Sequence, residues 1–515
     1  MLKRKLRSPA AFIIFRKAFV ILFVICVGIV FLIVVLASRD LLYEDYNGLS
    51  YDFSSSPEIL EGVLQQQVDV CLIKPPSRNP QFLMEDADSF ESFQDKATKE
   101  TSRHTLINTL AIFSDVMEVM GIKTGIIEPS ILFCMLTWPQ KQLLMKRNFN
   151  VSDVVGSQNT VTLGIFAKDA ELLEQDPIQS SIRSMGFQIV PVKEPLRNWM
   201  QEKTNFHRNK TFTGHIFYKR GIHLIHLVVF QERATYLWHA GLSEQVKSIL
   251  PLQDLLFVDA DSSYENFTFV PLLLKKYSMS LYVPSDPQYF LFQIRNSRFL
   301  ECNMSRAANL TTTPDPNSKS LEAFRRKFII SLRELKSRFR PLLQTFWIWS
   351  GTMLGWYRQC DIIPYTTDVD FGAWASEVED LDALVKLFLN DKHLSIRERM
   401  GLVDEALEFQ LRCYGLRVDV FFLYKIQNGT WYSGHRSGRG YYFRYYHPNF
   451  TLCSGDLLGE RVQVPCETEK VIIAEYGPEW SLPVPNWYYE SSIKNRGPNI
   501  YWDNSRVKLS YKEYS

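Results

Sequence analysis

An uncharged apolar run near the N-terminus constrains this 515-residue chain more than any other feature. Residues 18–37 carry no charge and are rich in Val, Ile, Leu and Phe. At about 1.5 Å of rise per residue, a helix of this length spans about 30 Å, the thickness of a bilayer's hydrocarbon core. The run therefore predicts a transmembrane signal-anchor over residues 18–38, after a cytoplasmic tail over residues 1–17. A cleaved signal peptide is the alternative, but its apolar region is normally about 7–15 residues long.

The charges that flank the apolar run predict its orientation. The residues before it include no acid and the basic residues Lys3, Arg4, Lys5, Arg7, Arg16 and Lys17. Since cytoplasmic segments retain Lys and Arg, the N-terminus should face the cytosol and everything after Arg39 should be lumenal. The net charge of the whole chain is only +2, which argues against a nucleic-acid-binding protein.

Glycosylation sequons and cysteines agree with a lumenal address. Seven N-x-S/T triplets occur, at Asn150, Asn209, Asn266, Asn303, Asn309, Asn428 and Asn449. Of the eight cysteines, Cys26 lies in the apolar run, so at least one of the remaining seven is unpaired or intermolecular. Cys453 and Cys466 flank a predicted turn and could pair, and no C-x-x-C zinc spacing is present.

The length predicts two folded domains with attachments, because a single core rarely exceeds about 250–300 residues. Residues 39–67 are polar and form a predicted stem. Residues 68–303 alternate strand-like runs, at 160–166, 187–192 and 222–230, with amphipathic segments, which is typical of an α/β or α+β fold. Residues 304–319, with the turn Pro314-Asp315-Pro316, form a predicted linker, and residues 320–515 form the second lumenal domain.

A strongly amphipathic helix is predicted directly after the linker. Ser320 can cap it, and Pro341 should end it. Apolar residues recur at spacings of three and four, namely Leu321, Phe324, Phe328, Leu332, Leu335 and Phe339. The opposite face carries Arg325, Arg326, Glu334 and Lys336, and such a basic face is expected to be solvated.

The segment that follows this helix has the pattern of an anion-binding turn. Residues 346–349 predict a short buried strand, Ser350 and Gly351 a turn, and residues 354–357 the start of a helix, whose first N–H groups attract anions. Gly351 would let the backbone approach a phosphate closely, and the hydroxyl of Ser350 or Thr352 could add a hydrogen bond. Arg358 lies further along the helix and could donate to the same anion.

Three aspartates outline a predicted metal site. Asp368 and Asp370 are two apart in a predicted strand, so their side chains share one face. Asp419 lies inside the apolar strand 415–423, where a charge is costly unless it is paired or bound to metal. If the strands are neighbours, the three carboxylates form a cluster that suits a hard divalent cation. The order of strand, turn, helix and D-x-D strand predicts a nucleotidyltransferase-like domain with a mixed sheet.

Several blocks of the chain resemble the fukutin family and, more distantly, the fukutin-related proteins and bacterial LicD-type phosphocholine transferases. The central block is S-G-T-M-L-G-W-Y-R-Q-C-D-I-I-P-Y-T-T-D-V-D, from Ser350 to Asp370. Further similar blocks cover residues 222–232, 297–302, 417–424, 448–453, 464–468 and 475–480. The resemblance thus extends over nearly the whole chain after the stem. One departure is Thr366, where some relatives carry an additional acid.

The resemblance implies a type II membrane enzyme of the Golgi, with the endoplasmic reticulum as the alternative. It implies transfer of ribitol 5-phosphate, or a related phospho-alditol, from CDP-ribitol or a similar CDP-linked donor to a glycoprotein glycan. Mg²⁺ or Mn²⁺ would be held by Asp368 and Asp370, with Asp419 as a third ligand or as the base. The pyrophosphate would be held by Ser350, Gly351, Thr352 and Arg358. Asp370 and Asp419 are therefore the predicted catalytic residues, and other glycan transferases are further expected partners.

Two other functions are open from the sequence. The first is a non-catalytic family member that assists another Golgi transferase, although a protein without activity has no electrostatic reason to keep the costly Asp419. The second is a sugar-nucleotide glycosyltransferase with a D-x-D metal site at Asp259 and Asp261, which follow the apolar residues 255–258.

Overall fold

The computed structural model describes residues 106–133, 135–136, 159–203, 211–247, 256–274, 279–310, 319–343, 345–389, 391–436, 440–484, 487–488 and 490–514. The predicted tail, signal-anchor and stem, residues 1–67, lie outside these ranges. Within the described part, no helix is both long enough and apolar enough to cross a bilayer. The described residues all fall within one compact unit, residues 65–515.

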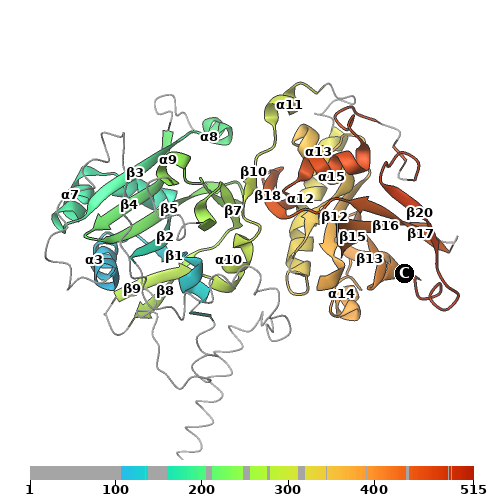
Figure 1. Ribbon diagram of the computed structural model, residues 1–515, viewed down its shortest axis with the longest axis horizontal. Helices are drawn as coiled ribbons and strands as arrows, with labels where there is room; N and C mark the ends of the chain where they lie inside the picture. The colour runs from blue at the N-terminus through green and yellow to red at the C-terminus, as the bar shows by residue number, and fades with distance from the viewer. Residues whose placement is uncertain are drawn as a thin grey trace, which may run out of the picture. The chain divides into compact units, whose positions relative to one another are not determined.

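The N-terminal half of the described chain contains a mixed sheet of nine strands with the path β3-β4-β5-β2-β1-β9-β8, to which β6 and β7 are added through β5 (Figure 1). The strands are β1 (Gly125–Ile126), β2 (Thr160–Phe166), β3 (Gln188–Pro195), β4 (Thr211–Arg220), β5 (His223–Arg233), β6 (Tyr236–His239), β7 (Ser262–Glu265), β8 (Phe269–Leu274) and β9 (Met279–Pro284). β2 matches the strand predicted at 160–166, and β3 and β5 extend the strands predicted at 187–192 and 222–230.

Helices pack on this first sheet and supply much of its core. They are α3 (Leu106–Val119), α6 (Ala167–Leu173), α7 (Asp176–Ser184), α8 (Asn198–Lys203), α9 (Glu244–Lys247) and α10 (Pro287–Ile294). Leu106, Leu110 and Phe113 of α3 are fully buried and belong to the same apolar cluster as the strand residues Leu163 and Val229. The apolar face of α3 therefore closes one side of the sheet.

The C-terminal half of the described chain contains a second nine-stranded mixed sheet with the path β20-β17-β16-β15-β14-β13-β21. The strands are β11 (Trp347–Ile348), β12 (Asp368–Trp374), β13 (Leu394–Leu402), β14 (Glu405–Cys413), β15 (Leu416–Ile426), β16 (Gly429–Arg436), β17 (Tyr441–His447), β20 (Arg496–Tyr501) and β21 (Tyr511–Glu513). β12 runs parallel to β15 and pairs antiparallel with β11. The predicted mixed α/β architecture of this half is confirmed.

The helices after β10 are α11 (Met304–Ala308), in the segment that joins the two halves, and α12 (Lys319–Phe339), α13 (Ser350–Gln359), α14 (Leu381–Lys386) and α15 (Thr468–Tyr476) of the second half. The predicted amphipathic helix is α12, which ends before Pro341 as expected and begins at Lys319, one residue before its predicted cap. The expectation of a solvated basic face holds for Arg326, whose side chain is 68% exposed, but not for Arg325 and Lys336. Arg325 pairs with Asp361, and Lys336 pairs with Glu265 at 2.9 Å, because the face lies against other parts of the protein.

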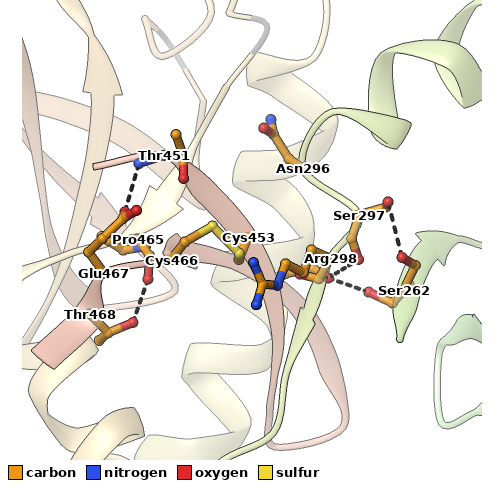
Figure 2. Close-up of a disulfide and its surroundings, with 12 residues drawn as sticks. Ser262, Asn296, Ser297, Arg298, Thr451, Cys453, Pro465, Cys466, Glu467 and Thr468 are labelled. Carbon is orange, nitrogen blue, oxygen red and sulfur yellow. Dashed lines mark hydrogen bonds between the residues drawn. A yellow bond between two sulfur atoms is a disulfide. The ribbon is translucent and has the colours of Figure 1, made fainter. Parts of the chain in front are cut away.

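A third, small sheet joins segments from both halves. β10 (Phe299–Leu300) pairs in parallel with β18 (Leu452–Leu457), which pairs with β19 (Glu460–Pro465). The predicted pair Cys453 and Cys466 forms a disulfide, and Figure 2 shows it beside Arg298, which immediately precedes β10. The predicted linker residues 304–310 are described and include the short helix α11. The two sheets are therefore joined by backbone pairing as well as by the chain.

Arg233, at the end of β5, is a buried cation that contacts residues of both halves. Its guanidinium donates to both carboxylate oxygens of Glu301, at 2.6 and 2.7 Å, and lies 3.6 Å from the carboxylate of Asp456 in β18. The rings of Trp199 and Phe299 lie 4.9 and 4.8 Å from the guanidinium carbon. Only 8% of the Arg233 side chain is exposed, so these partners, and not water, stabilise its buried charge.

Candidate functional site

The candidate site is built where β11, α13, β12 and β15 meet. Trp347 of β11 is in register with Gly372 of β12, and a Cβ at residue 372 would lie 2.5 Å from the Trp347 ring. A glycine is therefore required for β11 to pack on β12. The Trp349 N–H donates to the Asp370 carbonyl at 3.0 Å, so the start of α13 is placed beside Asp370.

Helix α13 begins at Ser350, which corrects the sequence prediction of a start near Leu354. The Gly351 N–H donates to Oδ2 of Asp370 at 3.0 Å, and the Thr352 hydroxyl accepts from the Asp370 N–H at 2.8 Å. A Cβ at residue 351 would lie 3.0 Å from that carboxylate oxygen. The Gly351 N–H at the helix start thus binds the carboxylate of Asp370, as expected for an anion at a helix N-terminus.

The residues predicted to hold a pyrophosphate have protein partners in this structure. Ser350 has a φ of 41°, a conformation unusual for a residue with a side chain, and its hydroxyl donates to Oε1 of Glu475 at 2.5 Å. Arg358 lies two turns further along α13, is 2% exposed, and donates to Oε1 of Gln359 at 3.1 Å. Gly351 and Thr352 hold Asp370. Their role toward a phosphate stays a prediction.

The three predicted aspartates are brought to neighbouring strands. Asp370 of β12 is in register with Asp419 of β15, and Asp368 is in register with Arg417. Because paired strands are about 4.8 Å apart and residues two apart share a face, the three carboxylates lie on one face of the sheet. Arg417 is the cation beside them, with a guanidinium nitrogen 3.0 Å from Oδ2 of Asp419. The prediction that Asp419 neighbours the D-x-D strand is confirmed.

The carboxylates repel one another in this arrangement. Burial raises the pKa of Asp370 well above its ordinary value, and the charges of Asp368, Asp419 and Glu475 raise it further. Burial also raises the pKa of Asp419, to about 6, although Arg417 opposes the shift. Thr366 stands where some relatives of the resembled family carry an additional acid. Its hydroxyl donates to Oδ1 of Asp368 at 3.1 Å.

The chemistry of this donor set fits a divalent cation. Its oxygens are carboxylates, which Mg²⁺ and Mn²⁺ prefer, and the negative charge around buried Asp370 exceeds what Arg417 balances. Among the described residues, however, no group of three or more His, Cys, Asp or Glu side chains is arranged to hold a metal ion. The three aspartates share a face, and their role as metal ligands stays a prediction.

Two buried glutamates join this cluster and were missed by the sequence analysis. Glu408 of β14 and Glu475 of α15 are 6% and 0% exposed, and Oε2 of each has no hydrogen-bond partner among the described residues. Burial raises the pKa of Glu408 well above its ordinary value and that of Glu475 to about 7. Glu408, like Asp419, is an acid within an apolar strand, so the sequence pattern that indicates Asp419 also indicates Glu408. Glu475 lies on a helix, where only packing could reveal its burial.

Glu475→Gln should make the protein more stable at alkaline pH. The pKa of Glu475 is raised from 4.5 to about 7 in the folded state by burial, so folding costs free energy once the group ionises. In the wild type this contribution to the unfolding free energy falls as pH rises from about 4.5 to about 7, by up to about 1.4 kcal/mol per pH unit. Urea denaturation at pH 5 and pH 8 should show a smaller loss on raising the pH for Glu475→Gln. Glu469 is exposed on the same helix, so Glu469→Gln should lose as much unfolding free energy between pH 5 and pH 8 as the wild type does. An equal loss for all three proteins would contradict the prediction.

The alternative site at Asp259 and Asp261 has the wrong structure for the predicted role. The expected buried strand before it is absent among the described residues, where residues 256–258 form a short 3-10 helix. Asp259 pairs with Lys247 at 2.5 Å. Asp261 pairs with Arg197 at 3.1 Å and accepts the Gly241 N–H at 2.9 Å. Each carboxylate is already balanced by a cation of the protein, so neither depends on a metal.

A second disulfide lies next to the candidate site. Cys360, which follows α13, is bonded to Cys302, which follows β10. Among the described cysteines, Cys413 is buried and has no disulfide partner, which agrees with the expectation of an unpaired thiol. Cys26, Cys71 and Cys134 lie outside the described residues.

Comparison with known proteins covers both halves of the chain. The family described as fukutin N-terminal matches residues 92–328, and the family described as LicD/FKTN/FKRP, nucleotidyltransferase domain, matches residues 344–467. The human protein named ribitol-5-phosphate transferase FKTN is 34% identical over 294 residues, which are 56% of this chain and 63% of that protein. The mouse protein of the same name is 33% identical over the same shares.

An uncharacterized protein of Caenorhabditis elegans is 28% identical over 277 residues, which are 50% of this chain and 68% of that protein. The chain thus spans less than two thirds of the length of the mammalian relatives that it matches. Ser350, Asp370 and Asp419 all fall within the matched nucleotidyltransferase segment, and the first sheet falls within the matched fukutin N-terminal segment. From these matches on both sides of residues 329–343, the chain belongs to the fukutin family.

Proposed function

We propose that this protein is a metal-dependent phosphotransferase that moves ribitol 5-phosphate, or a related phospho-alditol, from a CDP-linked donor to a glycan hydroxyl. The observation that carries the proposal is the convergence on Asp370: the start of α13 holds its carboxylate, and Asp419 lies in register on the parallel neighbour β15. This arrangement falls inside the matched nucleotidyltransferase segment. The name of the mammalian relatives supports ribitol 5-phosphate as the group transferred.

In the proposed reaction the hydroxyl oxygen of the acceptor attacks the phosphorus that carries the alditol. The bond from that phosphorus to the bridging oxygen breaks, CMP leaves, and the hydroxyl proton passes to a base. Asp419, in register with Asp370, would serve as a third oxygen ligand or as the proton acceptor. Gly351 and Thr352 hold Asp370 in place, and Ser350 is oriented by Glu475.

Asp368, Asp370 and Asp419 would hold Mg²⁺ or Mn²⁺, which would neutralise negative charge on the pyrophosphate. Arg417 is the protein's own cation at this position and pairs with Asp419. Its side chain is 48% exposed, so a bound phosphate could reach it.

The proposed setting is the lumenal face of the Golgi membrane, with residues 18–38 as a type II signal-anchor. The seven sequons and the disulfides Cys302–Cys360 and Cys453–Cys466 support an oxidising, glycosylating compartment. The acceptor would be a glycoprotein glycan, and other glycan transferases would be partners in the same compartment.

Nucleotide release by the purified protein tests the proposal. With Mn²⁺ and an acceptor glycan, CDP-ribitol should yield CMP, and CDP-glycerol, CDP-choline and UDP-sugars should yield less or none. Asp259→Asn should release CMP at the wild-type rate, because Asp259 pairs with Lys247 outside the site. Release of UDP instead would favour a sugar-nucleotide glycosyltransferase. No turnover with any donor, together with co-purification of another transferase, would favour a non-catalytic partner.

A further inference from the structure

The N-terminal half contacts α13 at the helix end opposite Asp370. The disulfide between Cys302 and Cys360 bonds the segment after β10 to the residue that ends α13. Arg306 of α11 donates to the Tyr357 carbonyl in the last turn of α13. Its guanidinium carbon lies 4.3 Å from the Tyr357 ring and 5.1 Å from the Trp480 ring. One covalent bond and one stacked cation therefore attach the segment after β10 to this helix end.

A separate path joins the same helix to the first sheet. The indole N–H of Trp356 donates to the Asp456 carbonyl at 2.8 Å. The carboxylate of Asp456 accepts from the hydroxyl of Tyr236 in β6 at 2.7 Å. Gly455, beside Asp456, leaves room for the Trp356 ring, since a Cβ there would lie 2.8 Å from it. Residues before 304 thus hold α13 through the side chain of Trp356 and through Cys360, which caps the C-terminal end of the helix.

Cys360 occupies the junction between the two parts of the candidate site. Gly351, which donates to Asp370, lies nine residues before it in α13, and Asp368 lies eight residues after it. Cys360 has a φ of 55° and ends the helix. The next residue, Asp361, accepts from Arg325 of α12. A movement of Cys360 would therefore displace α13, which precedes it, and residues 361–367, which lead to Asp368.

We propose that the N-terminal half and the segment that joins it to the second half position the catalytic helix: Cys302 and Arg306 are positioning residues that hold the C-terminal end of α13 so that its first turn stays on Asp370. The proposal gives the first sheet and β10 a role in the second half's chemistry. The expected loss of kcat rests on the proposed phosphotransferase function, but the expected change in hydrogen exchange over α13 does not.

The magnitude of the effect follows from the geometry of the Gly351–Asp370 contact. This hydrogen bond is 3.0 Å long, and a shift of about 1 Å would break it, since such bonds weaken steeply beyond about 3.2 Å. Misplacement of a catalytic group by about 1 Å can cost about 10²-fold in rate. We therefore expect release of the helix end to lower kcat by about 10- to 100-fold, with the KM for the donor changed less than about threefold.

Hydrogen–deuterium exchange measures the positioning without reference to activity. In Cys302→Ala/Cys360→Ala, peptides covering residues 350–372 should take up deuterium faster than in the wild type, and peptides from β2 and β5 should be unchanged. The control Cys453→Ala/Cys466→Ala also removes one disulfide, and its faster uptake should be confined to residues 452–466. Unchanged uptake over 350–372 in the first variant, or the same increase there in the control, would overturn the proposal.

Arg306 supplies a second variant that keeps both disulfides. Arg306→Ala should raise uptake over residues 350–359 and lower kcat, and Arg306→Lys should restore part of both, because Lys keeps the charge but loses the planar stacking on Tyr357. If wild-type protein turns over no CDP-linked donor, the proposed function fails while the exchange measurements still decide the positioning role. If kcat falls without any change in exchange over 350–359, the positioning role fails and the proposed function stands.

Discussion

Asp370→Asn is expected to abolish turnover of a CDP-linked donor while making the protein more stable. Asp370 is the residue on which the Gly351 N–H, the Thr352 hydroxyl and the neighbouring Asp419 all converge. Loss of its charge should cost about 4 kcal/mol of transition-state stabilisation, which is about 10³-fold in kcat/KM. CMP release at saturating Mn²⁺ and acceptor measures this loss.

The stability gain is expected because the ionised carboxylate of Asp370 is unfavourable in the folded state. The folded state raises the pKa of Asp370 because burial and the carboxylates of Asp368 and Asp419 oppose its ionisation. An acid whose pKa is raised on folding destabilises the protein above its unfolded pKa of 3.8, increasingly as pH rises. In EDTA at pH 8, the unfolding free energy of Asp370→Asn should exceed that of the wild type by more than about 1 kcal/mol.

Asp382→Asn is the matched control for both measurements, because Asp382 belongs to another D-x-D sequence but is exposed on α14. It should leave CMP release unchanged and shift the unfolding free energy by less than about 0.5 kcal/mol. An Asp370→Asn protein that retains more than a tenth of the wild-type kcat/KM would remove Asp370 from the proposed mechanism. A destabilised Asp370→Asn protein would show that burial and the neighbouring carboxylates do not make the charge of Asp370 unfavourable in the folded state.

Arg233→Met should destabilise the protein by about 3 kcal/mol, although Arg233 is far from Asp370 in the sequence. The substitution leaves the Glu301 and Asp456 carboxylates without their cation and removes the guanidinium between the Trp199 and Phe299 rings. Loss of one partner from a buried charge pair typically costs about 3–5 kcal/mol, and the lower figure applies because Glu301 is 52% exposed. The free energy of unfolding in urea measures the effect.

Arg197→Met provides the comparison for Arg233→Met. Arg197 also forms an ion pair, with Asp261, and also lies over a tryptophan ring, that of Trp238. Its side chain is 31% exposed, so water can solvate the partner that remains, and we expect a loss of less than about 1 kcal/mol. Equal losses for the two variants would mean that burial does not set the strength of the Arg233 contacts.

Much of the candidate site could be predicted from local pattern. A two-residue repeat places Asp368 and Asp370 on one face, and the apolar surroundings of Asp419 indicate burial. The same test applied to β14 would have found Glu408. Glu475 could not be found in this way, because its helix is buried on the side that packs near Ser350, and packing partners are not local in sequence. The start of α13 was predicted four residues late because the left-handed conformation of Ser350 has no sequence signal.

The amino-acid sequence by itself determined the elements and the family: the apolar run, the amphipathic helix α12, the acids in apolar strands and the blocks from Ser350 to Asp370 are properties of neighbouring residues. Only the tertiary structure decided which of these act together. It placed Asp370 beside Asp419, paired Asp259 and Asp261 with cations of the protein, and bonded Cys302 to Cys360. The reason is that charge balance and burial depend on groups from distant segments, which come together only when the chain packs.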